Sequence, residues 1–251
     1  YHLYSPERMR KHYPNATIVG AIKESYDYPN ASEERKKNRI KFYQECDCMA
    51  GYGIGDDVKK FWWYENIQKT TGLEMNWLPS PINLDYYYDN FYSNEKERCI
   101  YAYLPNPIPR RGRTYEFANY ISQKYNVPIK YKPLQEGQKF DYLSQKDFIN
   151  LWRPCLFHFN LDPSYQQPGQ QCVQVAASGC INIGGHNDSH FVLFPETATN
   201  DEKILEERFV EYLDNPEKQF EVISYAWDKL NETYSYPAVE KRLSNLSESL
   251  K

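Results

Sequence analysis

Three arginines and a glycine form one compact basic loop: Arg110, Arg111, Gly112 and Arg113. The loop follows the apolar run CIYAYL, which predicts a strand over 99–104, and precedes a predicted helix over 114–125. Guanidinium groups bind phosphate oxygens through paired hydrogen bonds, and a helix N-terminus adds free amides and a favourable dipole. This position favours a diphosphate site, with a solvated basic loop as the alternative.

A second loop leads into a helix that begins with a glycine. Gly169 lets a ligand approach the backbone closely, and the helix predicted over 169–178 points its first free amides at the same edge. Gln170 follows directly, and Gln174 lies about one turn in, where its amide would hydrogen-bond a ribose. The small side chains later in this helix leave an alternative, namely a helix that only packs closely against the sheet.

The third loop, Gly184 to His190, combines two glycines, Gly184 and Gly185, with polar side chains. Such a loop suits a hydrophilic ligand such as a sugar. His186 and His190 are candidates for acid–base chemistry or for phosphate contact. Asp188 between the two histidines leaves a metal site open as a weaker interpretation, and a plain turn is the third.

Alternating strands and helices must position these loops, and this alternation predicts parallel sheets flanked by helices. The strands are expected at 16–22, 47–52, 75–78, 99–104, 127–131, 155–160, 180–183 and 190–194. The helices are expected from Ser5 onward and at 32–44, 58–68, 114–125, 144–152, 169–178, 200–213, 216–230 and 236–250. Ligands of open α/β sheets bind beyond the carboxyl ends of the strands, where the three loops lie.

A polar, tyrosine-rich stretch from Asp85 to Glu97 separates the two groups of strands and is expected to be a linker. We therefore predict three parts. Residues 1–90 form a partial N-terminal α/β domain with its linker, 91–233 form a ligand-binding α/β domain, and 234–251 form a C-terminal helix.

Composition excludes some classes of protein. The 251 residues carry a net charge of -4, which argues against a general nucleic-acid binder. No apolar run reaches the ~18 residues that a transmembrane helix needs, and no signal-peptide segment is recognised. The six cysteines have no metal-site spacing, so we expect reduced thiols and a cytoplasmic location. Because the first residue is Tyr, we expect the chain to be a piece of a longer protein.

The run from Gln166 to Gly185 resembles the signature of group-1 (GT4-like) glycosyltransferases. In that signature two glutamates, separated by seven residues, span a glycine and lead into EAxAxG and a strand. Here Gln166 and Gln174 stand at the glutamate positions, Gly169 at the glycine, and Ala177-Ser178-Gly179 at the end of the motif.

Two more segments carry the resemblance. The pair Arg111-Gly112 stands where these enzymes have a Lys-Gly pair after the first strand of the donor domain. The tail from Leu205 to Leu243 is similar to the end of the family, with a helix, an Asn-Pro break, a second helix, an aromatic patch and a last helix. The resemblance covers roughly residues 98–243, and the residues before it match only as later βα units of a partner domain.

The resemblance implies a GT-B-like α/β fold of two Rossmann-like parallel-sheet domains, the first incomplete or reduced. It implies an enzyme of carbohydrate metabolism that transfers a hexosyl or pentosyl group from a nucleoside-diphosphate sugar to a glycan or other hydroxyl acceptor. No bound metal and no cofactor besides the donor are expected. Arg111 would stabilise the leaving diphosphate, and His186 or a residue of the first domain would act as the general base. The expected donor-binding residues are Arg110, Arg111, Gly112, Arg113, Gln166, Gly169, Gln170, Gln174, Gly184 and Gly185.

The two glutamines depart from the family pattern. Gln166 and Gln174 still form hydrogen bonds but carry no negative charge. They favour one alternative, a catalytically inactive module that binds a sugar nucleotide or a carbohydrate within a larger protein. Two further alternatives are a GT-B-like nucleotide-sugar epimerase, which would need several carboxylates in the cleft, and a structural α/β domain without a ligand.

Overall fold

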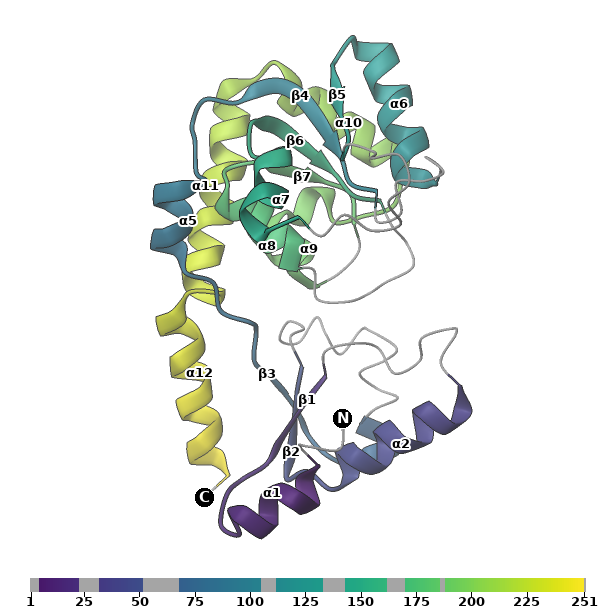
Figure 1. The fold of residues 1–251 in the computed structure, drawn as a ribbon. Coiled ribbons are helices and arrows are strands. Elements are labelled where there is room, and N and C mark those ends of the chain that lie inside the picture. Colours follow the sequence, from purple (N-terminus) through teal and green to yellow (C-terminus); the bar gives the residue numbers. More distant parts are fainter. Residues whose placement is uncertain are drawn as a thin grey trace. The chain divides into compact units, whose positions relative to one another are not determined.

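The computed structural model describes residues 5–22, 32–51, 68–104, 112–132, 143–161, 170–185 and 188–250, and Figure 1 labels its elements. These residues form two compact units, one from positions 5–81 and 236–250 and the other from positions 82–235. Each unit contains its own parallel sheet. The predicted class, two Rossmann-like α/β domains with a reduced first domain, is confirmed.

The first unit has three parallel strands in the order β1-β2-β3. Its elements are β1 (Val19–Ile22), β2 (Cys48–Gly51), β3 (Met75–Trp77), α1 (Pro6–His12), α2 (Glu33–Gln44) and α12 (Tyr236–Ser249). The side chain of Ser5 accepts a hydrogen bond from the Arg8 amide at the start of α1, as the sequence predicts. Asp47 accepts hydrogen bonds from the Ile18 amide at 2.7 Å and the Arg10 guanidinium at 2.8 Å, which joins α1 to this sheet.

The second unit has four parallel strands in the order β5-β4-β6-β7. The strands are β4 (Glu97–Ala102), β5 (Ile129–Lys130), β6 (Cys155–Phe159) and β7 (Ile181–Ile183). The helices are α5 (Leu84–Asn90), α6 (Arg113–Tyr125), α7 (Gln145–Trp152), α8 (Gln170–Ala177), α9 (Asp188–Leu193), the 3-10 helix η2 (Pro195–Thr197), α10 (Glu202–Leu213) and α11 (Pro216–Thr233).

Helices cover both faces of the second sheet (Figure 1). Successive residues of a strand face opposite sides. Cys99 and Tyr101 of β4 therefore pack in one core with α5, α7, α8, α9 and α11. Ile100 and Ala102 pack in the other core with α6 and α10. A parallel sheet buried on both faces explains why its strands read as continuous apolar runs.

The predicted strand over 190–194 is wrong, because α9 occupies Asp188–Leu193 and η2 follows it. A short apolar run such as FVLF cannot be assigned to strand or helix from periodicity alone. Here the run is helical because Leu193 and Phe194 are buried against the core that includes α8 and α11.

The predicted linker also contains a helix. Helix α5 begins after Asn83, whose side chain accepts a hydrogen bond from the Tyr86 amide at 3.0 Å. Tyr87 and Phe91, four residues apart, are buried in the second unit with ring centroids 5.3 Å apart. Because most residues of this stretch are polar, its sequence does not predict a helix with one buried apolar side.

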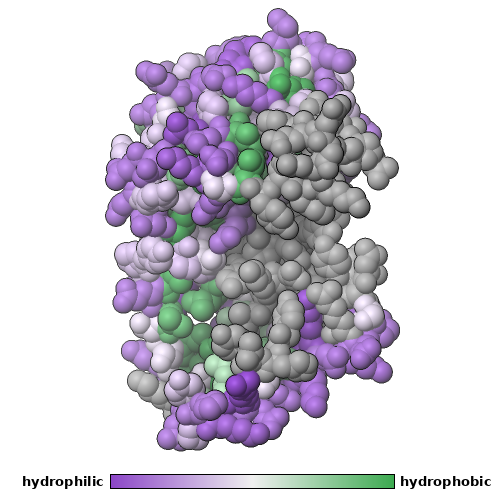
Figure 2. All heavy atoms as spheres, in the orientation of Figure 1, coloured by the Kyte–Doolittle hydropathy of each residue, from purple (hydrophilic) through white to green (hydrophobic). Residues whose placement is uncertain are grey.

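On the face shown in Figure 2, hydrophilic residues cover most of the described surface. None of the helices that the structure describes has the length and apolar character required to cross a membrane. All six cysteines are buried and none forms a disulfide, which agrees with the expected reduced thiols.

A substitution of Phe209 on α10 tests the packing of the core between the second sheet and helices α6 and α10. The Phe209 ring is fully buried, with its centroid 4.7 Å from that of Phe157 on β6. We expect Phe209→Ala to lower the free energy of unfolding by about 3 to 5 kcal/mol, measured by hydrogen exchange of the β4 and β6 amides in denaturant. Phe220 on α11 is 73% exposed and gives a matched control, since Phe220→Ala should change stability by no more than about 0.5 kcal/mol. Equal effects of the two substitutions would contradict the described packing.

Candidate functional site

The carboxyl ends of β4, β6 and β7 meet at one edge of the second sheet, because the three strands are parallel neighbours. Backbone hydrogen bonds extend this order past the strand ends. The Tyr103 amide donates to the Phe159 carbonyl at 2.9 Å, and the Asn160 amide donates to the Ile183 carbonyl at 3.0 Å. The chain segments that follow these three strands therefore all begin at the carboxyl edge of the second sheet, as the sequence predicts.

The structure describes part of the predicted site. Gly112, Arg113, Gln170, Gln174, Gly184 and Gly185 are among the described residues. The remaining predicted residues lie outside the described residues: Arg110, Arg111, Gln166, Gly169 and His186.

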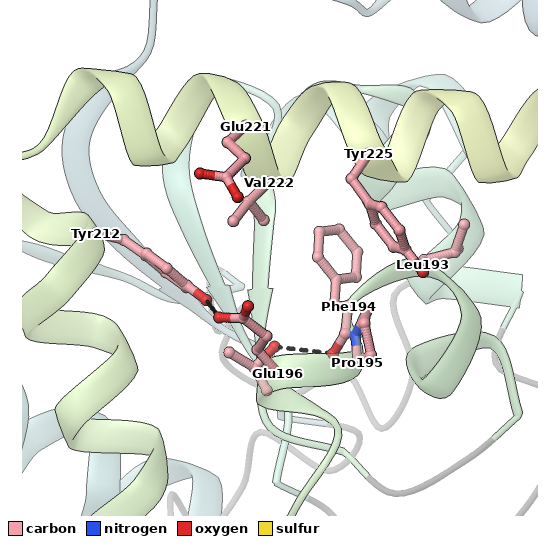
Figure 3. Close-up of a pocket in the computed structure, with 9 residues that line it drawn as sticks. Leu193, Phe194, Pro195, Glu196, Tyr212, Glu221, Val222 and Tyr225 are labelled. Carbon is pink, nitrogen blue, oxygen red and sulfur yellow. Dashed lines mark hydrogen bonds between the residues drawn. The ribbon is translucent and has the colours of Figure 1, made fainter.

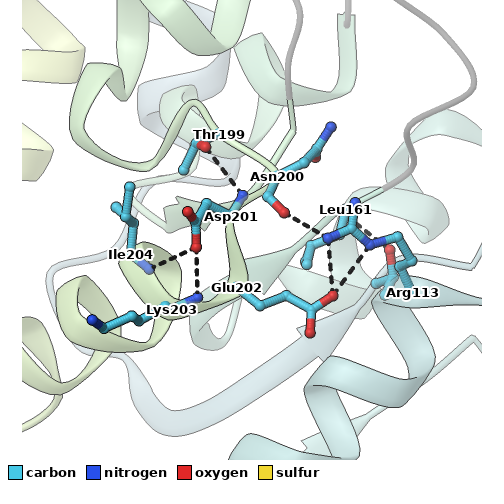
Figure 4. Close-up of polar contacts among 9 residues, drawn as sticks. Arg113, Leu161, Thr199, Asn200, Asp201, Glu202, Lys203 and Ile204 are labelled. Carbon is cyan, nitrogen blue, oxygen red and sulfur yellow. Dashed lines mark hydrogen bonds and ion pairs between the residues drawn. The ribbon is translucent and has the colours of Figure 1, made fainter.

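Gly112 and Arg113 form the start of α6. Gly112 has φ 97° and ψ 170°, a conformation that only glycine adopts readily. The Arg113 guanidinium contacts the Glu202 carboxylate at 2.9 Å and donates to the Asn200 carbonyl at 2.5 Å (Figure 4). Arg113 thus already joins the N-terminus of α6 to that of α10, and this ion pair competes with any phosphate for the guanidinium.

A buried hydroxyl joins α6 to the end of β6. The Leu161 amide donates to Oγ1 of Thr114 at 2.8 Å, and Thr114 is only 5% exposed. This contact fixes the chain that leaves β6 against the first turn of α6, so two of the three loops are held together by a specific hydrogen bond.

A relay of four residues links the part-buried Gln171 in the first turn of α8, through the buried His158 and Asn182, to Gly184 after β7. Nε2 of Gln171 lies 3.0 Å from Nε2 of His158, and Nδ1 of His158 lies 2.9 Å from Oδ1 of Asn182. Nδ2 of Asn182 donates to the Gly184 carbonyl at 2.7 Å. An amide nitrogen donates and an amide oxygen accepts, so these contacts require a neutral imidazole with its hydrogen on Nδ1.

Burial makes this neutral state the stable one. His158 is 1% exposed, and desolvation lowers its pKa to about 4, although the Asn182 contact opposes the shift. A neutral His158 keeps the whole relay oriented, and the relay holds the Gly184 carbonyl in one position.

Gly184 and Gly185 leave no room for side chains. Their φ angles are 86° and 98°. A Cβ on Gly184 would lie 2.8 Å from Cγ of Leu161, and one on Gly185 would lie 2.5 Å from Cε1 of His190. His190, a candidate for chemistry from the sequence, is 1% exposed on α9 and packs under this loop. The glycines are therefore explained by close packing and by backbone conformation.

Helix α8 places its two predicted glutamines differently. Gln170 is exposed at the first position of the helix. Burial raises the pKa of the Tyr87 hydroxyl of α5, and the side chains of Gln145 and Gln174 oppose this shift. Tyr87 accepts a hydrogen bond from Gln145 of α7 at 3.1 Å, and Gln174 lies on the side of α8 near this contact.

Within the residues that the structure describes, no group of three or more His, Cys, Asp or Glu side chains is arranged to hold a metal ion. Two members of the proposed cluster, His186 and the side chain of Asp188, fall outside that description.

Sequence reasoning missed the relay. Gln171, His158 and Asn182 were not selected, although His158 and Asn182 each interrupt an apolar strand, CLFHF and INI. A polar residue inside a strand that is buried on both faces must find a hydrogen-bond partner, and that requirement is the signal that identifies such residues.

No protein-family profile matches the chain, and no curated protein matches its sequence. The chain is similar to the apo structure of OtsA, with 10% identity and a TM-score of 0.64, covering 100% of this chain and 71% of that one. It is similar to the N-terminal domain of trehalose-6-phosphate phosphatase from Candida albicans, with 10% identity and a TM-score of 0.60, covering 100% and 70%. It is also similar to Anabaena Alr3699/HepE in complex with UDP and glucose, with 9% identity and a TM-score of 0.59, covering 97% and 74%. The chain therefore has the GT-B fold that its signature implies.

His158 makes folding depend on pH. An unfolded histidine takes up a proton near pH 6.5, whereas His158 does so only near pH 4 in the folded chain. Stability should therefore fall by on the order of 3 kcal/mol as the pH decreases from about 6.5 to about 4. We expect His158→Gln to remove most of this loss, measured as urea unfolding of the second unit at pH 7 and pH 4.5.

The exposed His12 of α1 provides the control, because His12→Gln should leave the pH dependence of the second unit unchanged. If His158→Gln loses as much stability on acidification as the unsubstituted chain, the imidazole is not held neutral and the described relay is wrong.

Proposed function

We propose that this chain transfers a sugar from a nucleoside-diphosphate sugar to a glycan or other hydroxyl acceptor. One observation carries the proposal: in a GT-B fold, the carboxyl ends of β4, β6 and β7 lie at one edge of the second sheet, and side-chain hydrogen bonds link the described residues that flank the three predicted loops. A fold likeness to HepE, whose structure holds UDP and glucose, supports a nucleotide sugar as the ligand of this edge. The net charge of -4 favours a neutral acceptor over a nucleic acid.

Charge stabilisation supplies the chemistry in this proposal. Departure of the diphosphate creates negative charge, and Arg111, assisted by Arg110, would stabilise it without a metal ion or a separate cofactor. Amides around Gly169 at the start of α8 would hydrogen-bond the same phosphates. Arg113 would contribute only if its guanidinium left the Glu202 carboxylate and bound a phosphate oxygen instead.

The sugar would lie against the loop that the relay holds. Gly184 and Gly185 are buried and carry no side chains, and the hydrogen bond from Asn182 to the Gly184 carbonyl holds the start of this loop in place. His186 follows at once and is the proposed general base, with a residue of the first unit as the alternative.

A second candidate function is a catalytically inactive module that binds a sugar nucleotide. The glutamines at positions 166 and 174 favour it, because a glutamine side chain does not supply the charged group of the signature. The two candidates share the binding site and differ in turnover. A GT-B-like epimerase would use the same donor site and differ in its product.

Binding is tested with a panel of UDP, GDP and ADP sugars by isothermal titration calorimetry. We expect one nucleotide to bind, and Arg111→Ala to weaken its binding by about 10- to 100-fold through loss of charge-assisted hydrogen bonds. Arg8 on the exposed side of α1 gives the control, because Arg8→Ala removes the same charge without touching the site. If Arg111→Ala binds the nucleotide as tightly as the unsubstituted chain, the proposed contact between Arg111 and the diphosphate is wrong.

Turnover separates the enzyme from the module. With the nucleotide that binds, we expect slow hydrolysis of the donor in water, detected as release of the free nucleoside diphosphate. His186→Ala should reduce this rate by at least about 100-fold while leaving donor affinity within about threefold, since a general base acts on the reaction and not on binding. Tight binding with no hydrolysis and no transfer to any acceptor would identify the module, and an epimerised sugar would identify the epimerase.

A further inference from the structure

A cavity of about 180 Å³ lies in the second unit. It is bounded by η2, the end of α9, α10 and α11 (Figure 3). The residues that shape it are Leu193, Phe194, Glu196, Tyr212, Glu221 and Tyr225. None of these residues belongs to the proposed donor site, so the cavity requires its own explanation.

The inner wall of the cavity is apolar and rigid. Leu193, Phe194 and Tyr212 are each no more than 2% exposed, which means that the surrounding core holds them in place. Tyr225 completes the wall from α11 and is 41% exposed, so this side opens to solvent. An apolar cavity of about 150 Å³ accommodates a benzene ring, so the present one admits a ligand of roughly six to ten heavy atoms.

Two carboxylates from different elements stand at the mouth of the cavity. Glu196 belongs to η2 and Glu221 to α11, and their side chains are 52% and 65% exposed. Oε2 of Glu196 accepts a hydrogen bond from the Tyr212 hydroxyl at 2.7 Å. Because Tyr212 is itself buried, it fixes the Glu196 carboxylate beside the cavity (Figure 3).

The positive and negative charges that contact one another at this mouth do not sum to zero. Arg208 lies 3.5 Å from Glu196 and 2.6 Å from Glu211, and Lys218 lies 2.7 Å from Glu221. Three carboxylates thus share two cations, which leaves one net negative charge. An anionic ligand would be repelled, and a monocation would complete the balance.

We propose that this cavity binds a small organic monocation, an ammonium group carried on a ring or a short carbon chain. The carbon frame occupies the wall formed by Leu193 and Phe194. The ammonium lies at the mouth beside Glu196 and Glu221, and the Tyr225 ring, which already has Nζ of Lys229 5.8 Å from its centroid, contributes to the wall around the carbon frame. This inference does not rest on the proposed transferase activity, because none of its residues takes part in donor binding.

Benzylammonium is the probe, and benzyl alcohol has the same frame without the charge. We expect benzylammonium to bind the full chain with a dissociation constant of about 1 mM or lower, measured by titration calorimetry and by saturation-transfer NMR. Benzyl alcohol should bind at least about fivefold more weakly, and added salt should reduce that preference. Equal binding of the two compounds, or no binding of benzylammonium at 10-fold higher concentration, about 10 mM, overturns the proposal.

Conservative substitutions locate the probe. Glu221→Gln removes an exposed carboxylate without disturbing the core, and we expect it to weaken benzylammonium binding about fivefold. Glu196→Gln keeps an acceptor for Tyr212 and should act similarly, and the double substitution should abolish the preference for ammonium over alcohol. Glu207, exposed on α10, is the control, since Glu207→Gln removes an equal charge away from the cavity. An equal loss of affinity in Glu207→Gln and Glu221→Gln would show that binding reflects net charge and not this site.

Discussion

The hydrogen bond between the neutral imidazole of His158 and the side chain of Asn182 is the constraint on which the candidate site depends. It lies inside a sheet whose faces are both buried, where an unpaired polar group is costly. The sheet therefore tolerates these two polar residues only while the relay is complete. Completing it requires Gln171 at the start of α8 and the Gly184 carbonyl after β7, so the core itself fixes two parts of the sheet edge relative to each other.

The proposed donor site does not require the two glutamates of the signature, whose positions are occupied by Gln166 and Gln174. Positive charge and free amides at one edge suffice to bind a diphosphate, and neither depends on those glutamates. What the glutamines change is the supply of fixed negative charge near the donor. In this proposal, donor binding and turnover depend on different residues, so experiments can separate them.

The sequence predicts most strands of the second unit because burial on both faces makes each one a continuous apolar run. It failed at 190–194, where an equally apolar run is a helix, and at α5, where tyrosines in a polar stretch form a buried helix face. The glycines of the third loop stay predicted ligand-binding residues, and their close packing against Leu161 and His190 is a further role that the sequence does not predict. The relay and the acidic cavity depend on contacts between residues far apart in the chain, such as Glu196 with Tyr212, and no local pattern reveals those.

The central claim is that a nucleoside diphosphate binds at the carboxyl edge of the second sheet. A crystal structure of the chain soaked with the nucleotide sugar that binds best tests it most directly. The account predicts density for the diphosphate beside Arg111 and the first turn of α8, with the sugar against Gly184 and Gly185. Density at any other place on a chain that binds the nucleotide, or arginines at 110 and 111 that point into bulk solvent away from it, would contradict the account.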